Sequence, residues 1–275
     1  MTIDINLRLV EANLKTSVIG KSSNCPNEYH KVIDSTNNRL IELSKNGANS
    51  GTIVLAYEQT SGRGRFGHSF ISPPGHGLYL SILYKTSQDR HLNLLTLGLG
   101  VAAANVIKFH TGFQIKLKWV NDLIANEKKL GGILVESPFV VNQEKTLIIG
   151  IGINIIPFVY DTDKILTPIE FLNNLTTKPI NLELFIADLA LEIETLLFYI
   201  ESENFLASEI VKQWLEYNCT IDKNIKAILG NDVIFGRAIG INGSGELIIE
   251  TTDTDKPITL SAGQVSIRNI DGKYV

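Results

Sequence analysis

Two arginines in a glycine-rich loop are the residues whose types and spacing most clearly suggest chemistry. Arg63 and Arg65 lie within residues 59–77, a segment rich in glycine and proline with few side chains that could pack in a core. Loops of this length without internal structure are uncommon in compact domains and are usually functional. The glycines let the backbone approach a ligand, and guanidinium groups bind oxyanions such as carboxylates and phosphates. A solvated basic turn explains the two arginines equally well, so both interpretations stay open.

The same loop also matches a dinucleotide-binding pattern, but its context is wrong. Gly62, Gly64 and Gly67 fit G-x-G-x-x-G and follow a predicted strand. That pattern binds a pyrophosphate only where a helix begins at the third glycine. Pro73 and Pro74 leave no room for such a helix, so the dinucleotide interpretation is excluded.

A second candidate is a lysine next to two glycines. Lys129 lies one residue before Gly131 and Gly132, where the missing side chains would let a ligand lie against a strand. Asn121 and Asp122 end the preceding strand, and their more common role is that of turn residues.

Glycines also interrupt an apolar strand further along the chain. Gly150 and Gly152 are followed by Asn154. Close packing of strands would explain the glycines, but a buried asparagine needs hydrogen-bond partners of its own.

Composition and charge restrict the class of protein. Of the 275 residues, 44% are hydrophobic and 20% charged, which is enough to bury a sizeable core and excludes a disordered or fibrous chain. The formal net charge of −4 disfavours nucleic acid as a partner over the whole surface. Cys25 and Cys219 form neither a disulfide framework nor a metal-binding cluster, so we expect a reducing compartment.

The sequence also argues against membrane insertion and secretion. The most apolar window, residues 92–107, has helical spacing and is shorter than the ~20 residues needed to cross a bilayer. The N-terminus has no apolar signal-peptide region. We therefore expect a cytoplasmic protein without a membrane partner.

Hydrophobic periodicity predicts an α+β domain with a mixed or antiparallel sheet and flanking helices. Residues 1–30 carry weak structural signals and are expected to form an extension, and a short helix with an exposed N-terminus begins at Ser35. A turn at 126–128 is expected to join strands 115–119 and 130–136 as a hairpin. The other expected strands are 52–57, 78–84 and 146–156. The other expected helices are 92–107, 181–200 and one that contains Val211, Trp214 and Leu215.

The last part of the chain predicts a small barrel. Short apolar strands at close spacing alternate with turn residues, and a boundary is expected near residues 219–223. The expected strands are 225–229, 233–241, 246–251, 257–260 and 264–268, separated by turns at 230–232, 242–245 and 261–263.

Taken together, the motifs resemble those of the biotin protein ligases. The order and spacing of five segments agree with that family, which is far more specific than any single segment. The segments are Ser35-Thr36-Asn37, Gln59 with Gly62-Arg63-Gly64-Arg65, Lys118-Trp119-Val120-Asn121-Asp122, Lys129 with Gly131-Gly132-Ile133-Leu134, and Gly150-Ile151-Gly152-Ile153-Asn154.

The resemblance implies a fold and a domain organisation. Residues 31–220 would form a catalytic domain similar to class II synthetases, which binds biotin and ATP. Residues 221–275 would form an SH3-like β-barrel. The resemblance further implies ATP-dependent ligation of biotin, through biotinyl-5′-adenylate, to a lysine of the biotin carboxyl carrier protein or domain of a carboxylase. The enzyme would be a monomer or a homodimer.

Roles for individual residues follow from the same resemblance. Lys129, Arg63 and Arg65 would be catalytic, and Asp122 would lie near Mg2+. ATP would be bound by Arg65, Asn121, Lys129 and Asn154. Biotin would be bound by Ser35, Thr36, Asn37, Gln59, Gly62, Arg63, Gly64, Arg65, Lys129, Gly131 and Gly132.

Departures and rival functions remain open at this point. Val120 replaces the proline usual in the family, and His68 and Phe70 stand where many members have arginine and tryptophan. One rival is a lipoate protein ligase, whose apolar substrate would have little use for Ser35, Thr36 and Gln59. Another is a biotin-sensing regulator without catalysis, which would need a DNA-binding or partner module; the residues before Ser35 are too few for a winged helix.

Overall fold

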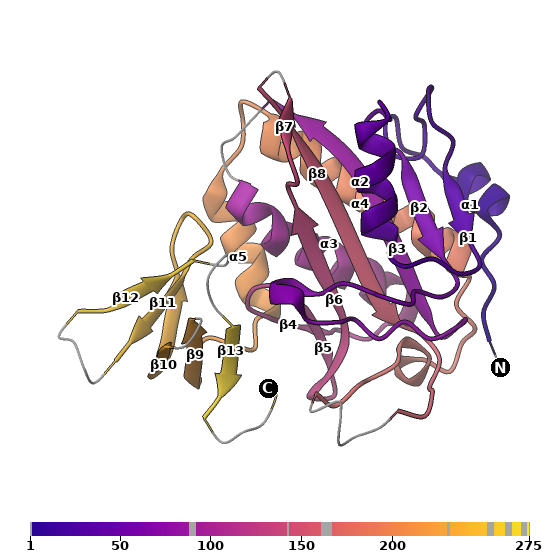
Figure 1. The fold of residues 1–275 in the computed structure, drawn as a ribbon. Helices are drawn as coiled ribbons and strands as arrows, with labels where there is room; N and C mark the ends of the chain where they lie inside the picture. Colours follow the sequence, from indigo (N-terminus) through magenta and orange to yellow (C-terminus); the bar gives the residue numbers. More distant parts are fainter. Residues whose placement is uncertain are drawn as a thin grey trace.

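The chain folds into two sheets that lie beside one another, with helices packed on the larger one (Figure 1). The computed structural model describes residues 2–87, 92–141, 143–160, 167–229, 232–251, 256–261, 266–270 and 274. Its α-helices are α1 (Leu7–Asn13), α2 (Thr36–Lys45), α3 (Leu92–Thr111), α4 (Leu182–Glu201) and α5 (Ala207–Tyr217), with short 3-10 turns at Arg65–Gly67 and Leu172–Leu175.

The larger sheet is mixed, as the sequence predicts. Its strands run in the order β1-β2-β3-β8-β6-β5-β4, and β7 pairs with β8. The β1–β2 pair is parallel and the other described pairs of this sheet are antiparallel. The strands are β1 (Glu28–His30), β2 (Ile53–Ala56), β3 (Gly77–Thr86), β4 (Lys116–Lys118), β5 (Asp122–Ala125), β6 (Lys128–Glu136), β7 (Val140–Val141) and β8 (Glu144–Asn154).

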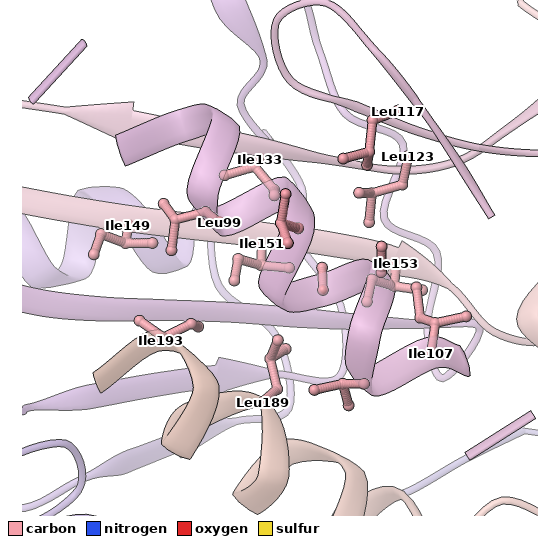
Figure 2. Close-up of a cluster of buried hydrophobic side chains, with 14 of the residues drawn as sticks. Leu99, Ile107, Leu117, Leu123, Ile133, Ile149, Ile151, Ile153, Leu189 and Ile193 are labelled. Carbon is pink, nitrogen blue, oxygen red and sulfur yellow. The ribbon is translucent and has the colours of Figure 1, made fainter. Parts of the chain in front are cut away.

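One face of this sheet carries the main core. Alternate residues of a strand point to opposite faces, and Ile149, Ile151 and Ile153 of β8 face α3. Figure 2 shows α3 lying between these isoleucines and α4, with Leu99 against the sheet and Leu189 on α4. Helix α3 is therefore apolar around most of its surface because it is covered on two sides.

Helix α3 is also longer than the apolar window suggested. By length and composition its Leu94–Thr111 segment would suffice to cross a membrane, but 67% of that segment is buried inside the fold. Its hydropathy is explained by its position between the sheet and α4.

The opposite face of the sheet is thinly covered. Helix α2 packs there through Leu40, against Val54, Leu83 and Ile148. Beyond the start of α2 the loop of residues 59–77 runs over this face, with Phe70 against Gly152 of β8. This arrangement leaves room for a ligand above the central strands.

Residues 2–30 do not form the weakly structured extension that the sequence suggested. Val10 of α1 and Ile19 are completely buried, and β1 extends the larger sheet. The carboxylate of Glu194 on α4 accepts hydrogen bonds from the backbone N–H groups of Ser17, Val18 and Ile19 at 2.6–2.8 Å. These contacts are made by backbone groups, which leave no mark on the side-chain pattern, and so hydrophobic periodicity missed this segment.

The expected hairpin also differs in detail. The turn at Asn126 and Glu127 joins β5 to β6, whereas β4 pairs with β5 and not with β6. A second reversal at Trp119–Asn121 places Asp122 at the start of β5. The chain reverses twice within a stretch in which the sequence suggested one strand followed by one turn. The peptide bond between Trp119 and Val120 is cis.

The smaller sheet contains the last five strands. They are β9 (Asn224–Leu229), β10 (Asp232–Ile241), β11 (Leu247–Glu250), β12 (Ile258–Leu260) and β13 (Ser266–Asn269), in the order β12-β11-β10-β9-β13 with all pairs antiparallel. The separate C-terminal β-sheet unit is thus confirmed. The expected turn residues 230, 231, 262 and 263 and the strand residues 264 and 265 lie outside the described residues.

Candidate active site

A cavity of about 440 Å³ lies on the thinly covered face of the larger sheet, within the range typical of sites for small molecules. Strands β3, β6 and β8 form its floor, and α2, the 59–77 loop and the smaller sheet form its walls. It brings together most of the residues singled out in the sequence. Those that line it are Ser35, Thr36, Asn37, Gln59, Arg63, Gly64, Arg65, Asn121, Asp122, Lys129, Gly132 and Asn154.

The glycines of the floor explain why the cavity exists. Gly152 pairs with Tyr79 on one side and Gly132 on the other, so two positions of this row lack side chains. A Cβ at Gly152 would lie 2.6 Å from the ring of Phe70, and a Cβ at Gly150 would lie 2.4 Å from Asn37 Oδ1. These glycines therefore seat cavity-lining side chains against the strand.

Gly132 differs from these two. A Cβ there would meet no described atom closer than 3.5 Å, so the protein itself leaves this space open. Gly62 and Gly131, which were expected to contact the ligand, do not line the cavity. A Cβ at either would lie 2.3 Å from a backbone carbonyl, that of Phe70 or of Gly152, so these two glycines permit close approach of backbone to backbone.

One end of the cavity, the neutral end, consists of uncharged polar groups at the start of α2. Gln59 Oε1 accepts hydrogen bonds from Thr36 N at 2.9 Å and Thr36 Oγ1 at 3.0 Å. Ser81 Oγ on β3 lies 2.6 Å from Asn37 Oδ1. Ser35, Thr36 and Asn37 are at most 4% exposed, so the helix start is not exposed as expected. The network fixes the direction of each donor and acceptor before a ligand arrives.

Arg63 stands above the neutral end but is already engaged. Its Nη2 lies 2.5 Å from Glu136 Oε1, and its Nη1 donates to Asn38 Oδ1 at 2.6 Å. Glu136 Oε2 in turn accepts a 2.7 Å hydrogen bond from Asn37 Nδ2. Arg63 therefore ties the loop to β6 and α2.

The other end of the cavity, the charged end, centres on an ion pair. Lys129 Nζ lies 2.6 Å from Asp122 Oδ1, and the Tyr274 hydroxyl donates a hydrogen bond to Asp122 Oδ2. Burial by itself raises the pKa of Asp122, but the Lys129 charge and these contacts outweigh it and hold the pKa below its usual value. Oδ1 is buried and meets no aligned hydrogen-bond donor among the described residues, and it faces the Lys129 ammonium.

Two asparagines orient groups of the charged end. Asn121 Oδ1 lies 3.4 Å from Arg65 Nη1, while Asn121 Nδ2 donates to the Ile133 carbonyl at 3.0 Å. Asn154 Nδ2 donates to the Lys129 carbonyl at 3.3 Å, so this buried amide has the partner that it requires. Burial lowers the pKa of Arg65, opposed by the nearby Asp122 charge.

Lys118 is a further cation of this end, to which the sequence gave no role. It is 4% exposed, and burial lowers its pKa to about 8. Its Nζ donates to the Tyr274 carbonyl at 2.5 Å and lies 3.7 Å from the centre of the Tyr274 ring. Arg268 of the smaller sheet also lines the cavity. Both sheets therefore contribute to one site.

Sequence reasoning missed several residues of the site. Ser81 carried a signal, because it is a polar residue in an otherwise apolar strand. Tyr274 and Arg268 carried none, since only the packing of the smaller sheet brings them to the cavity. Phe70, one of the departures from the family pattern, covers Gly152 and lies edge-on to Tyr79 at 6.5 Å between ring centres.

The arrangement of charges defines the chemistry that the site can perform. A neutral hydrogen-bonding end is joined through an apolar floor to an end rich in cations. Such a cavity can hold an uncharged polar group at one end and neutralise negative charge at the other. Among the described residues, no group of three or more His, Cys, Asp or Glu side chains is placed to hold a metal ion.

Comparison with known families gives two matches. Residues 29–154 match the biotin/lipoate A/B protein ligase family. Residues 220–268 match the biotin protein ligase C-terminal domain.

Individual proteins are similar over most of the chain. The bifunctional ligase/repressor BirA of Bacillus subtilis is 32% identical over 257 residues, which cover 90% of this chain and 75% of the relative. The biotin–[acetyl-CoA-carboxylase] ligase of Paracoccus denitrificans is 27% identical over 220 residues, covering 78% and 90%. Among solved structures, the biotin protein ligase of Aquifex aeolicus in complex with biotin and ATP superposes with a TM-score of 0.75 at 28% identity, covering 88% of this chain and 98% of that one.

Proposed function

The chain belongs to the biotin protein ligase family, and from this premise we propose that it attaches biotin to a lysine of the biotin carboxyl carrier protein or domain of a carboxylase. The reaction uses ATP and passes through biotinyl-5′-adenylate. The enzyme is thus a ligase with two half-reactions in one cavity.

The observation that carries this proposal is the division of the cavity into two chemically different ends. Thr36 and Gln59 present neutral donors and acceptors suited to the uncharged ureido group of biotin. At the other end, Arg65 and Lys129 present cations suited to a carboxylate and phosphates. The apolar ring of Phe70, which lines the cavity against Gly152, suits the hydrocarbon chain of biotin.

The first half-reaction needs charge neutralisation more than a protein nucleophile. A carboxylate oxygen of biotin attacks the α-phosphorus of ATP, a carboxyl–phosphate bond forms, and the bond to the β-phosphate breaks to release pyrophosphate. Both reactants are anions, so their repulsion is the main obstacle. We assign Lys129 to the oxygens shared by the carboxylate and the α-phosphate, and Arg65 to the phosphates.

The remaining residues hold these cations in place or bind the substrates. Asn121 lies beside Arg65 and Asn154 supports the Lys129 backbone. Ser35, Asn37, Gly64 and Gly132 line the space for biotin. Arg63 can reach the biotin carboxylate only by leaving Glu136, so we assign it first to closing the loop over the cavity.

The donor set fits a magnesium ion carried in by ATP. Asp122 offers one buried oxygen that has no aligned donor in the part of the chain that the structure describes. Mg2+ bound to phosphates needs only one or two carboxylates from the protein. We propose Asp122 as that carboxylate. The ion would neutralise charge on the departing pyrophosphate.

The second half-reaction transfers the biotinyl group. The amine of the carrier lysine attacks the acyl carbon of the adenylate, an amide bond forms, and AMP leaves. We propose that residues 31–220 perform the catalysis and that the C-terminal sheet helps to receive the carrier. We place the reaction in the cytoplasm, a reducing compartment that suits the free thiols of Cys25 and Cys219.

Biotin-dependent exchange between ATP and pyrophosphate tests the function directly. We expect exchange with biotin and little with lipoate, because a dithiolane has no groups that could pair with the neutral end. Equal exchange with the two acids would contradict the assignment. Labelling of a carrier domain by biotin and ATP then tests the transfer step.

A variant of Gln59 tests which end binds biotin. Gln59→Leu leaves Thr36 without its acceptor and removes one polar contact for the ligand. Loss of such a hydrogen bond costs about 1–3 kcal/mol, so we expect the biotin Kd to rise about tenfold. The KM for ATP is the internal control and should stay within about twofold. An equal rise in both constants would mean that the two ends are not separate.

A further inference from the structure

Tyr274 contacts several charged groups of the site, although it is far from most of them in the sequence. Its hydroxyl donates to Asp122, its carbonyl accepts from Lys118 at 2.5 Å, and its ring covers the Lys118 ammonium. Its side chain is buried, with 8% of the residue exposed. Arg268 lies 5.7 Å from the centre of the same ring.

These contacts divide the carboxylate of Asp122 between two partners. Oδ2 is held by Tyr274, and Oδ1 faces Lys129 at 2.6 Å. A carboxylate held at one oxygen cannot rotate freely, so the hydroxyl fixes the direction in which Oδ1 attracts the ammonium. The position of Lys129 thus depends on a tyrosine that is 145 residues away in the sequence.

We infer that Tyr274 is a positioning residue for adenylate formation, which sets Lys129 through Asp122. The inference rests on the proposed function, since it gives Lys129 its task. It assigns to the end of the chain a role in the first half-reaction, separate from any contact of the C-terminal sheet with the carrier.

The hydroxyl and the ring of Tyr274 perform different tasks. The hydroxyl serves Asp122, whereas the ring and the backbone carbonyl cover Lys118. Tyr274→Phe removes the first contact and keeps the others, and Tyr274→Ala also removes the ring. A hydrogen bond to a charged group contributes about 1.5–3 kcal/mol, so its loss predicts a fall of about tenfold or more in a rate that depends on it.

The chain contains a matched control. Tyr84 on β3 is 6% exposed, and its hydroxyl donates to the carboxylate of Glu201 at 2.9 Å. Neither Tyr84 nor Glu201 is among the described residues that line the cavity. Tyr84→Phe therefore removes a similar buried hydrogen bond without touching the site.

The experiment compares the full-length chain and the three variants in biotin-dependent ATP–pyrophosphate exchange, together with their melting temperatures. We expect Tyr274→Phe to lower kcat about tenfold and to leave the KM for biotin unchanged, with Tyr274→Ala lower still. Tyr84→Phe should lose thermal stability but keep its kcat.

The outcomes separate the possibilities. A kcat for Tyr274→Phe within twofold of the unsubstituted chain would overturn the inference, as would a loss in kcat matched by Tyr84→Phe. Absence of exchange in the unsubstituted chain would instead overturn the proposed function itself, and the inference with it.

Discussion

Asp122 and Glu194 are two largely buried carboxylates that the fold neutralises in different ways. The pKa of each lies below its usual value although burial alone would raise it. Glu194 accepts hydrogen bonds from three consecutive backbone N–H groups and from the Ser17 hydroxyl. Asp122 instead faces the ammonium of Lys129 and the hydroxyl of Tyr274.

The difference separates a structural anion from a functional one. Backbone N–H groups of a folded segment cannot turn to another partner, so Glu194 fixes the N-terminal segment against α4. The Lys129 ammonium is at the end of a flexible chain and 26% of its side chain is exposed. Its three N–H donors let it bind an incoming phosphate or carboxylate while it still faces Asp122, which is what a site for anionic substrates requires.

We expect the largest effect from a variant that breaks the ion pair between Lys129 and Asp122. Lys129→Ala removes the cation assigned to the transition state, and loss of one such group lowers rates by about 10²–10³. We therefore expect adenylate formation to fall by that factor in ATP–pyrophosphate exchange.

Lys128→Ala is the control for this variant. Lys128 is the exposed neighbour at the start of β6, so its replacement should change the rate little. Similar rates for the two variants would contradict the assignment. Lys129→Ala also leaves Asp122 largely buried without its partner, so its free energy of unfolding should fall by about 3 kcal/mol or less. The sequence alone does not show that Lys129 pairs with Asp122, so it would not predict this loss.

Removing the charge of Glu194, the structural anion, should mainly lower the stability and change the reaction rate little. Glu194→Gln replaces a charged acceptor by an amide whose NH₂ group would face backbone donors. Hydrogen bonds to a charged group contribute about 1.5–3 kcal/mol, so we expect the melting temperature to fall by roughly 4–8 °C. The kcat should stay within about twofold at temperatures at which the variant is folded. A large loss in kcat would mean that the N-terminal segment takes part in the site.

The pH dependence sharpens this test. The folded pKa of Glu194 is below the usual glutamate value of about 4.3, so the carboxylate stabilises the fold fully above that value. This contribution is lost as the pH falls through the folded pKa. The difference in melting temperature between the unsubstituted chain and Glu194→Gln should therefore be constant at neutral pH and should shrink on acidification. A difference that grows at low pH would contradict the lowered pKa.

These two regions also show what could be read from the sequence. The sheet, α3, α4 and the motifs around Arg63 and Lys129 follow from local periodicity and local spacing. The neutral end was predictable because Thr36 and Gln59 belong to motifs with recognisable neighbours.

Long-range partners were not predictable in this way. Glu194 looks like any glutamate of an amphipathic helix, and its partners are backbone groups of residues 17–19, which leave no mark on the side-chain pattern. Tyr274 lies in a segment without a motif. The contacts of Glu194 and of Tyr274 depend on tertiary packing, which brings together residues that are far apart in the sequence. For the same reason, the prediction that residues 1–30 form a weakly structured extension was wrong.

The smallest effect concerns Ser17, the side-chain donor to Glu194 among the described residues. Ser17 Oγ donates to Glu194 Oε1 at 2.9 Å beside the three backbone donors. Ser17 is exposed, so water can replace part of this bond, and Ser17→Ala should lower the free energy of unfolding by about 0.5–1 kcal/mol. The melting temperature should fall by roughly 1–4 °C. In a Glu194→Gln background the same substitution should have a smaller effect, because the charge that strengthens the bond is absent. If Ser17→Ala were as destabilising as Glu194→Gln, the side chain and not the backbone would hold the anion, and the contrast with Asp122 would fail.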